Sequence, residues 1–237
     1  MVVFISGIGF LGYVLIKLVG PRRGIGLTGL LGGLVSSTAV TLSFSQRARK
    51  APSLSRALAL AISLSWTVMF VRVLIEAAVV GGQLVTALWP PILASGAVGL
   101  LYCTFLLLSE RPAGQEEVKL AAPFELGPAI KFGLLYALIL VSSKAAQMYL
   151  GDAGVYLASV VSGVADVDAI TLSMARLSAA GDLPLSTAAR AVVLAAMANT
   201  AVKGGIVLAL GAPGLRRAVL PGLLAMLATG VGLAFLI

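Results

Sequence analysis

The chain has 237 residues, of which 59% are hydrophobic and only 11% are charged, and its net charge is +8. An ordinary soluble domain is about a quarter charged, so this composition and the mean hydropathy of +1.07 exclude a typical water-soluble protein. Stretches of about 20 apolar residues are long enough to cross a bilayer. The sequence therefore predicts an all-α, polytopic membrane protein. No nucleic-acid partner is expected, because the basic residues lie mostly in short polar breaks and form no stripe interleaved with aromatics.

Apolar runs separated by charged or glycine- and proline-rich breaks predict eight membrane helices. The first is interpreted as a retained span, because Met1–Val19 lacks the basic region and the cleavage site of a signal peptide. The longest polar stretch, Ser109–Glu125, is the predicted linker between two halves, residues 1–118 and 119–237. The expected helices cover about 1–19, 24–44, 57–80, 90–109, 127–150, 153–175, 187–210 and 218–237.

The two halves are similar in sequence when the chain is displaced by 130 residues, which indicates an internal repeat. The identical pairs are Gly24–Gly154, Leu27–Leu157, Gly33–Gly163, Ala39–Ala169, Thr41–Thr171, Leu42–Leu172 and Ser43–Ser173. Four spans in each half return the chain to the side where it started, so the repeats are predicted to be parallel. A re-entrant segment in each half would make them inverted instead.

The distribution of basic residues predicts that both termini face the cytoplasm, by the positive-inside rule. With eight spans, the expected cytoplasmic segments hold Arg47, Arg49, Lys50, Arg56, Arg111, Lys119, Lys131, Arg176 and Arg190. The expected outer segments hold only Arg22, Arg23, Arg216 and Arg217. Small-residue faces on several helices are compatible with a homodimer within the lipid bilayer.

Two carboxylates in the predicted sixth helix are the main candidates for chemistry, because ionisable groups at membrane depth are costly and usually functional. Asp166 and Asp168 stand two residues apart, and a regular helix would point them about 200° from each other. Both can serve one site only if the helix is broken. The equivalent positions in the second helix are Ser36 and Thr38, which follow a glycine-rich stretch. Two such segments predict discontinuous second and sixth helices with an ion site between the halves.

Neutral oxygens and a network of charged side chains complete the predicted site. The expected neutral ligands are Ser36, Ser37, Thr38, Thr41 and Thr171. The expected network consists of Arg72, Glu76, Lys144, Asn199 and Lys203. For the glycines alone, close helix packing is the preferred interpretation, and a purely structural ion-pair network is the alternative for the charges.

The residues favour a transporter or channel for an inorganic cation, with Asp166 and Asp168 as metal ligands or proton carriers. Hard oxygen ligands suit Mg²⁺, Na⁺ or H⁺. Unpaired Arg72 and Lys203 facing a cavity would instead favour an anion or small-solute permease. A non-transporting scaffold or regulatory subunit is the alternative from another class. The chain has no histidine, a single cysteine and no catalytic motif, so neither an enzyme nor a cofactor is expected.

Several segments together resemble a membrane domain, without an assigned activity, that is commonly fused behind MgtC/SapB domains. They are Ser6–Tyr13, Gly20–Gly24, Gly32–Thr41, Ser162–Ala169 and Asn199–Lys203. The association with MgtC implies a role in ion physiology, magnesium in particular, at the bacterial inner membrane. No MgtC-type domain precedes these segments in the sequence, so regulation by such a domain does not follow from the resemblance.

Overall fold

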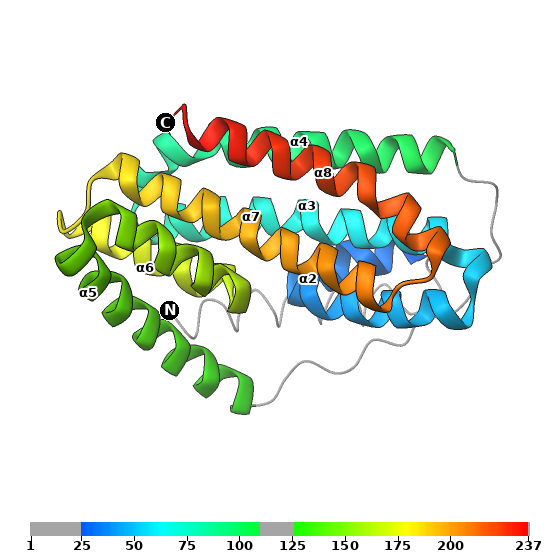
Figure 1. The fold of residues 1–237 in the computed structure, drawn as a ribbon, viewed down its shortest axis with the longest axis horizontal. Helices are drawn as coiled ribbons and strands as arrows, with labels where there is room; N and C mark the ends of the chain where they lie inside the picture. The colour runs from blue at the N-terminus through cyan, green and yellow to red at the C-terminus, as the bar shows by residue number, and fades with distance from the viewer. Residues whose placement is uncertain (1–24, 110–125, 237) are drawn as a thin grey trace.

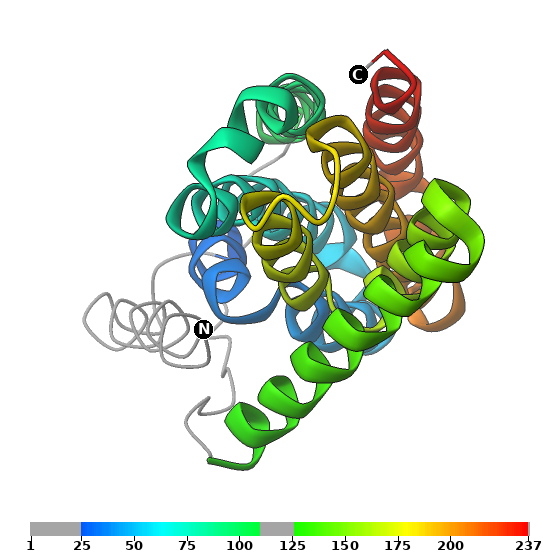
Figure 2. The ribbon, with the colours of Figure 1, turned by 90° about the vertical axis from the view of Figure 1, so that its left-hand side faces the viewer.

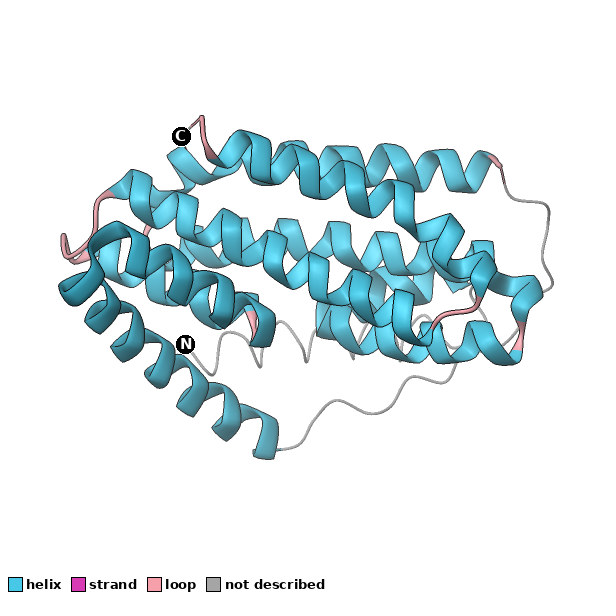
Figure 3. Cartoon of the chain, viewed as in Figure 1, coloured by secondary structure: helices cyan, strands magenta, loops and turns pink. Residues whose placement is uncertain are grey.

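The computed structural model describes residues 25–109 and 126–236, and it is almost entirely α-helical in these ranges (Figures 1 and 3). The helices are α2 (Ile25–Lys50), α3 (Ser55–Val80), α4 (Gly82–Leu108), α5 (Leu126–Ala165), α6 (Val167–Ala179), α7 (Leu185–Leu210) and α8 (Pro213–Ala234), with a short 3-10 helix, η1 (Pro52–Leu54), between α2 and α3. The predicted all-α class is confirmed. The expected helix at 1–19 and the boundary between the halves at 118–119 lie outside the described residues.

Six helical segments of the described chain are long and apolar enough to cross a membrane, with lengths from 18 to 29 residues. Large apolar side chains such as Leu101 and Val161 are exposed on the outside of the bundle. That surface would be unfavourable in water but suits contact with lipid. The chain is therefore a multi-pass membrane protein.

Helices α4 and α8 begin earlier than the sequence analysis expected, at Gly82 and Pro213 instead of about 90 and 218. Pro91 and Pro221, at equivalent positions of the repeat, both lie inside their helices. Proline is tolerated within membrane helices, because neighbouring groups take up the backbone hydrogen bonds that it frees.

Helix α2 folds back on itself at Ser36, whose backbone is extended (φ −165°, ψ 106°). After this break, Thr41 lies beside Trp66 of α3, as in an ordinary antiparallel hairpin. Before the break, Gly29 lies against Ala61 and Gly33 lies against Ser65, so this segment runs parallel to α3. The two segments of α2 thus enter and leave the bundle at the same end, which makes α2 a re-entrant pair.

The second half contains an equivalent re-entrant pair, formed by the end of α5 together with α6. The chain first turns sharply at Gly151, where φ is +60° and glycine is strongly favoured. Residues 152–165 then run into the bundle, the helix breaks at Asp166, and α6 returns (Figure 1). The first segment of α5 lies at the periphery of the bundle (Figure 2). The predicted breaks in the second and sixth helices are confirmed.

The two halves run in opposite directions, so the prediction of parallel repeats is wrong. Helices α3 and α7 occupy equivalent places in the repeat, yet they cross the bundle with opposite polarity, as do α4 and α8 (Figure 1). The reason is the re-entrant pair in each half. A segment that enters and leaves on one side changes the number of crossings from even to odd.

The re-entrant geometry also regroups the basic residues. The side chains of Arg49 and Arg216 both donate to the carbonyl oxygen of Ala209, at 2.8 and 3.5 Å, although they were expected on opposite sides. We call this the basic end of the bundle; Arg47, Arg49, Lys50, Arg56, Arg216 and Arg217 lie here. The α6–α7 connection with Asp182, and the C-terminus, lie at the opposite end (Figure 1).

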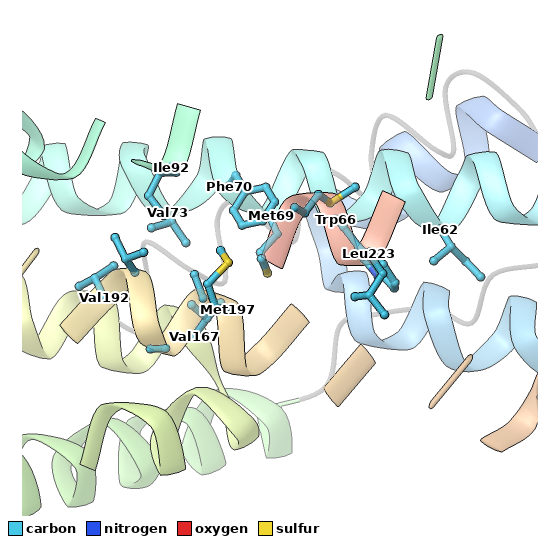
Figure 4. Close-up of a cluster of buried hydrophobic side chains, with 14 of the residues drawn as sticks. Ile62, Trp66, Met69, Phe70, Val73, Ile92, Val167, Val192, Met197 and Leu223 are labelled. Atoms are coloured by element: carbon cyan, nitrogen blue, oxygen red, sulfur yellow. The ribbon is translucent and has the colours of Figure 1, made fainter. Parts of the chain in front are cut away.

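One continuous core of buried apolar side chains lies between the two halves. Met69, Phe70 and Val73 of α3 approach Val192 and Met197 of α7 (Figure 4). All five side chains are at most 3% exposed. The two halves pack against each other where α4 meets α7 and α8, where α3 meets α6 and α8, and where α2 meets α7.

Candidate functional site

The two helix breaks are built in the same way from different residues. Asp166 has an extended backbone (φ −161°, ψ 121°), and its carboxylate caps α6 by accepting from the N–H groups of Asp168, at 2.7 Å, and Ala169, at 3.2 Å. Ser36, its equivalent, accepts from the N–H of Ala39 at 3.2 Å. Each break therefore starts a new helix with a side-chain cap, and the positive end of that helix points at the centre of the bundle.

Close glycine contacts press the incoming segments against the crossing helices. An ideal Cβ on Gly33 would lie 2.7 Å from Cα of Ser65, and one on Gly163 would lie 2.7 Å from Cα of Ala195. The helix break also frees carbonyl oxygens for side chains. Gly163 O accepts from Asn199 Nδ2 at 2.8 Å, and Gly33 O lies 3.4 Å from Nη1 of Arg72.

The crossing helix of each half reaches the broken helix of the other half. Arg72 Nη2 on α3 contacts Asp168 Oδ2 on α6 directly. In return, Lys203 Nζ on α7 donates to Ser37 Oγ on α2 at 3.0 Å, beside the sulfur of Met69. The side chains of Arg72 and Asp168 are 7% and 15% exposed, and Lys203 is fully buried. These two contacts connect the halves at the site.

Glu76 completes the cluster and is its least satisfied member. It is fully buried, and its Oε1 lies 3.6 Å from Arg72 Nη2, one helical turn away on α3. Neither carboxylate oxygen has a hydrogen-bond partner among the described residues. Such a group is rare in a folded protein, because an unpaired buried polar atom is costly.

The ionisable groups of this cluster interact electrostatically with one another. Asp168 forms an ion pair with Arg72, and Oε1 of Glu76 lies 3.6 Å from Nη2 of the same guanidinium. The cluster contains three carboxylates, those of Glu76, Asp166 and Asp168, and two basic groups, those of Arg72 and Lys203, so its formal charges sum to −1. The cluster can therefore accept a cation without a net excess of positive charge.

The structure brings together most, but not all, of the predicted site residues. Lys144 lies away from the cluster and pairs with Asp182 at 2.9 Å, where the two side chains are 52% and 40% exposed. Thr38 is exposed. The hydroxyls of Thr41 and Thr171 donate to carbonyl oxygens of their own helices, at 2.7 and 2.8 Å. Within residues 25–109 and 126–236, no three acidic, cysteine or histidine side chains form a metal-binding group, so the predicted metal ligands Asp166 and Asp168 have no third partner there.

Sequence reasoning missed the Lys203–Ser37 contact and the role of the Gly33 and Gly163 carbonyls. A usable signal was present in the glycines that precede each break. Glycine at membrane depth permits close backbone approach, and a broken helix exposes carbonyl oxygens to nearby donors.

Comparison with known proteins places most of the chain in one family. The family described as "Domain of unknown function (DUF4010)" matches residues 3–211. A protein of Aquifex aeolicus (strain VF5), described as "Uncharacterized protein", is 38% identical over 192 residues, which cover 80% of this chain and 84% of the relative. No solved structure matches.

Proposed function

We propose that the chain, which belongs to the DUF4010 family, is a transporter that moves an inorganic cation through the site between its two inverted halves. The observation that carries this proposal is the meeting of two broken helices around a buried cluster with one more acid than base. Charged groups buried at membrane depth are costly, and they usually mark ion or substrate pathways.

The pairing of the basic groups favours a cation over an anion. Arg72 is held by Asp168 and Glu76, so its charge is already compensated. Lys203 donates to Ser37 and is fully buried, so its ammonium group does not face an open cavity. Carboxylates, hydroxyls and backbone carbonyls are hard oxygen donors, which suit Na⁺, Mg²⁺ or a proton.

The inverted repeat favours a carrier over a channel. Carriers with inverted repeats bind substrate near the bilayer midplane and expose it to the two sides by moving one part against another. Here the contacts Arg72–Asp168 and Lys203–Ser37 each join the two halves at the site. Breaking one contact while the other holds would open the site on a single side.

The charge distribution also suggests an orientation in the cell membrane, the inner membrane in a bacterium with two. The positive-inside rule places the basic end of the bundle in the cytoplasm. Because the C-terminus lies at the opposite end, it would then face outward, in contrast to the cytoplasmic C-terminus expected from eight simple crossings.

Flux measurements in proteoliposomes test the proposal. Purified protein is reconstituted, and the uptake of Na⁺, K⁺, Mg²⁺, H⁺ and chloride is followed with ion-sensitive dyes. The decisive variants are Asp168→Asn and Asp166→Asn, which remove a negative charge at nearly constant side-chain volume; at position 166 asparagine can also keep the helix cap. We expect wild-type protein to carry one cation and both variants to lose most of that flux, with Lys144→Gln as the matched control outside the site.

Two outcomes would contradict the proposal. Chloride uptake without cation uptake would indicate an anion permease. A folded wild-type protein that moves none of these ions, with Asp168→Asn and Asp166→Asn variants that only lose stability, would support a non-transporting scaffold whose charges fix helix packing.

A further inference from the structure

Arg72 stands between two carboxylates, and in this structure it makes close contact with only one of them. Its Nη2 contacts Asp168 on α6 directly, while Glu76 Oε1 on its own helix is 3.6 Å away. Arg72 and Glu76 lie one turn apart on α3, so a rotation of the arginine side chain would exchange the partners without moving the helix.

Glu76 is suited to be an alternative ion-pair partner for Arg72. It is fully buried, and both of its oxygens are without a hydrogen bond in the described part of the chain, as is Nε of Arg72. A complete Arg72–Glu76 pair would satisfy these atoms together, since a guanidinium can donate two hydrogen bonds to one carboxylate. Helix α4, which packs against α3, has no charged residue that could replace Arg72 in this pair.

We propose that Arg72 is a tethered competitor of the transported cation, resting on Asp168 in the unloaded protein and moving to Glu76 when a monovalent cation binds at Asp166 and Asp168. This inference rests on the proposed cation transport. It assigns Arg72 and Glu76 as positioning residues, which act on the cation through Asp168.

The charges of the cluster select a monovalent cation. Once Arg72 pairs with Glu76, the groups left at the site are Asp166, Asp168 and Lys203, whose formal charges sum to −1. One Na⁺, K⁺ or proton neutralises this charge, whereas Mg²⁺ would leave an uncompensated positive charge in a buried site. When Arg72 returns to Asp168, it displaces the bound cation. The movement of Arg72 between Glu76 and Asp168 therefore also releases the cation.

Binding measurements on four proteins test the exchange. Wild type, Arg72→Gln, Glu76→Gln and the double variant Arg72→Gln/Glu76→Gln are titrated in detergent with NaCl, KCl and MgCl₂ by calorimetry, with choline chloride as the ionic-strength control. Proton movement is followed separately with a pH-sensitive dye inside proteoliposomes. Lys144→Gln, whose ion pair lies outside the site, controls for the loss of a positive charge.

The inference predicts opposite effects for the two single variants. Glu76→Gln removes the alternative partner of Arg72 and weakens monovalent-cation binding by about tenfold or more, because the competing charge cannot leave Asp168. Arg72→Gln removes the competitor, so it tightens binding by a similar factor while slowing release and flux. The double variant regains at least the wild-type affinity.

The double variant separates this inference from a simpler role for Glu76. If Glu76 were itself a ligand of the cation, the double variant would bind as weakly as Glu76→Gln, and the exchange would be refuted. Loss of binding in a folded Arg72→Gln protein would refute it as well. Should Arg72→Gln fail to fold, the double variant still decides, since it leaves no unpaired carboxylate at position 76.

Failure of this inference is distinguishable from failure of the proposed function. If wild type moves a cation but the three variants bind it with wild-type affinity, cation transport stands and the exchange is wrong. If wild type neither binds nor moves any of these cations, the proposed function itself fails.

Discussion

At the scale of single residues, the repeat identified the site better than hydropathy did. Ser36 and Asp166 were paired by displacement of the chain, and both prove to be the residues at which a helix breaks. Arg72 and Glu76, both predicted members of the charge network, lie one helical turn apart on α3 and form an ion pair. Lys144 was misassigned because it lies in an apolar run. The turn at Gly151, which brings that segment to the periphery, cannot be located from hydropathy alone.

The hydrogen bond from Trp66 to Thr41 gives a residue-scale prediction. Trp66 Nε1 donates to Thr41 Oγ1 at 2.8 Å, and both side chains are fully buried. Thr41→Val leaves the indole N–H without an acceptor and should lower the free energy of unfolding by about 1–3 kcal/mol. The measurement is SDS-induced unfolding in mixed micelles.

The second half provides a matched control for this prediction. Thr171 is equivalent to Thr41, but the position equivalent to Trp66 is Ala196. The alanine side chain has no hydrogen-bond donor, so no donor is left without an acceptor when Thr171 is replaced. Thr171→Val should therefore cost about 0.5 kcal/mol or less. Equal losses in the two variants would show that the indole hydrogen bond contributes nothing.

At the scale of elements, the sequence located the helices but not the direction of every segment. Composition sets where apolar runs start and stop, so α3 and α7 were predicted to within a few residues. Whether a run crosses the bilayer or returns depends on contacts made at a distance, such as Gly29 against Ala61. Treating the second and sixth helices as re-entrant would have placed Arg49 and Arg216 on the same side of the membrane, as the structure has them.

The close contact at Gly33 gives a prediction at the element scale. A methyl group there would meet the backbone of Ser65, which cannot shift without moving α3. Gly33→Ala should destabilise the protein by about 1–3 kcal/mol and reduce flux by displacing the tip of α2. Gly205→Ala is the control, because a Cβ at Gly205 meets nothing within 4 Å and alanine favours the helix. The free energy of unfolding and the cation flux are measured on both variants. A Gly33→Ala protein with wild-type stability and flux would contradict the close packing of α2 on α3.

At the scale of the whole molecule, inversion of the halves was the step that sequence alone left open. The repeat is evident in residues 24–43 and 154–173, but similarity of sequence carries no information on direction. Direction depends on the number of crossings in each half, and one re-entrant pair per half changes that number. The family match and the relative from Aquifex aeolicus identify similar chains. The opposite directions of the two halves are seen in the fold (Figure 1).

The proposed orientation predicts which residues are accessible from outside the cell. With Cys103 replaced by alanine, Ser186→Cys and Ser53→Cys report on opposite ends, since both serines are exposed, at the start of α7 and in η1. A membrane-impermeant maleimide should label Ser186→Cys in intact cells and Ser53→Cys only after permeabilisation. The reverse pattern would invert the orientation, and labelling of both from outside would contradict the arrangement of the ends.

A counterflow experiment distinguishes a carrier site between the inverted halves from a channel and from a non-transporting scaffold. Proteoliposomes are loaded with the unlabelled cation identified by the flux measurements, and uptake of the labelled cation is followed from a low external concentration. We predict that internal cation accelerates uptake by wild type and not by Asp168→Asn, because a carrier returns faster when loaded. Uptake by wild type no faster than in protein-free liposomes, or equal acceleration in both proteins, would contradict the account.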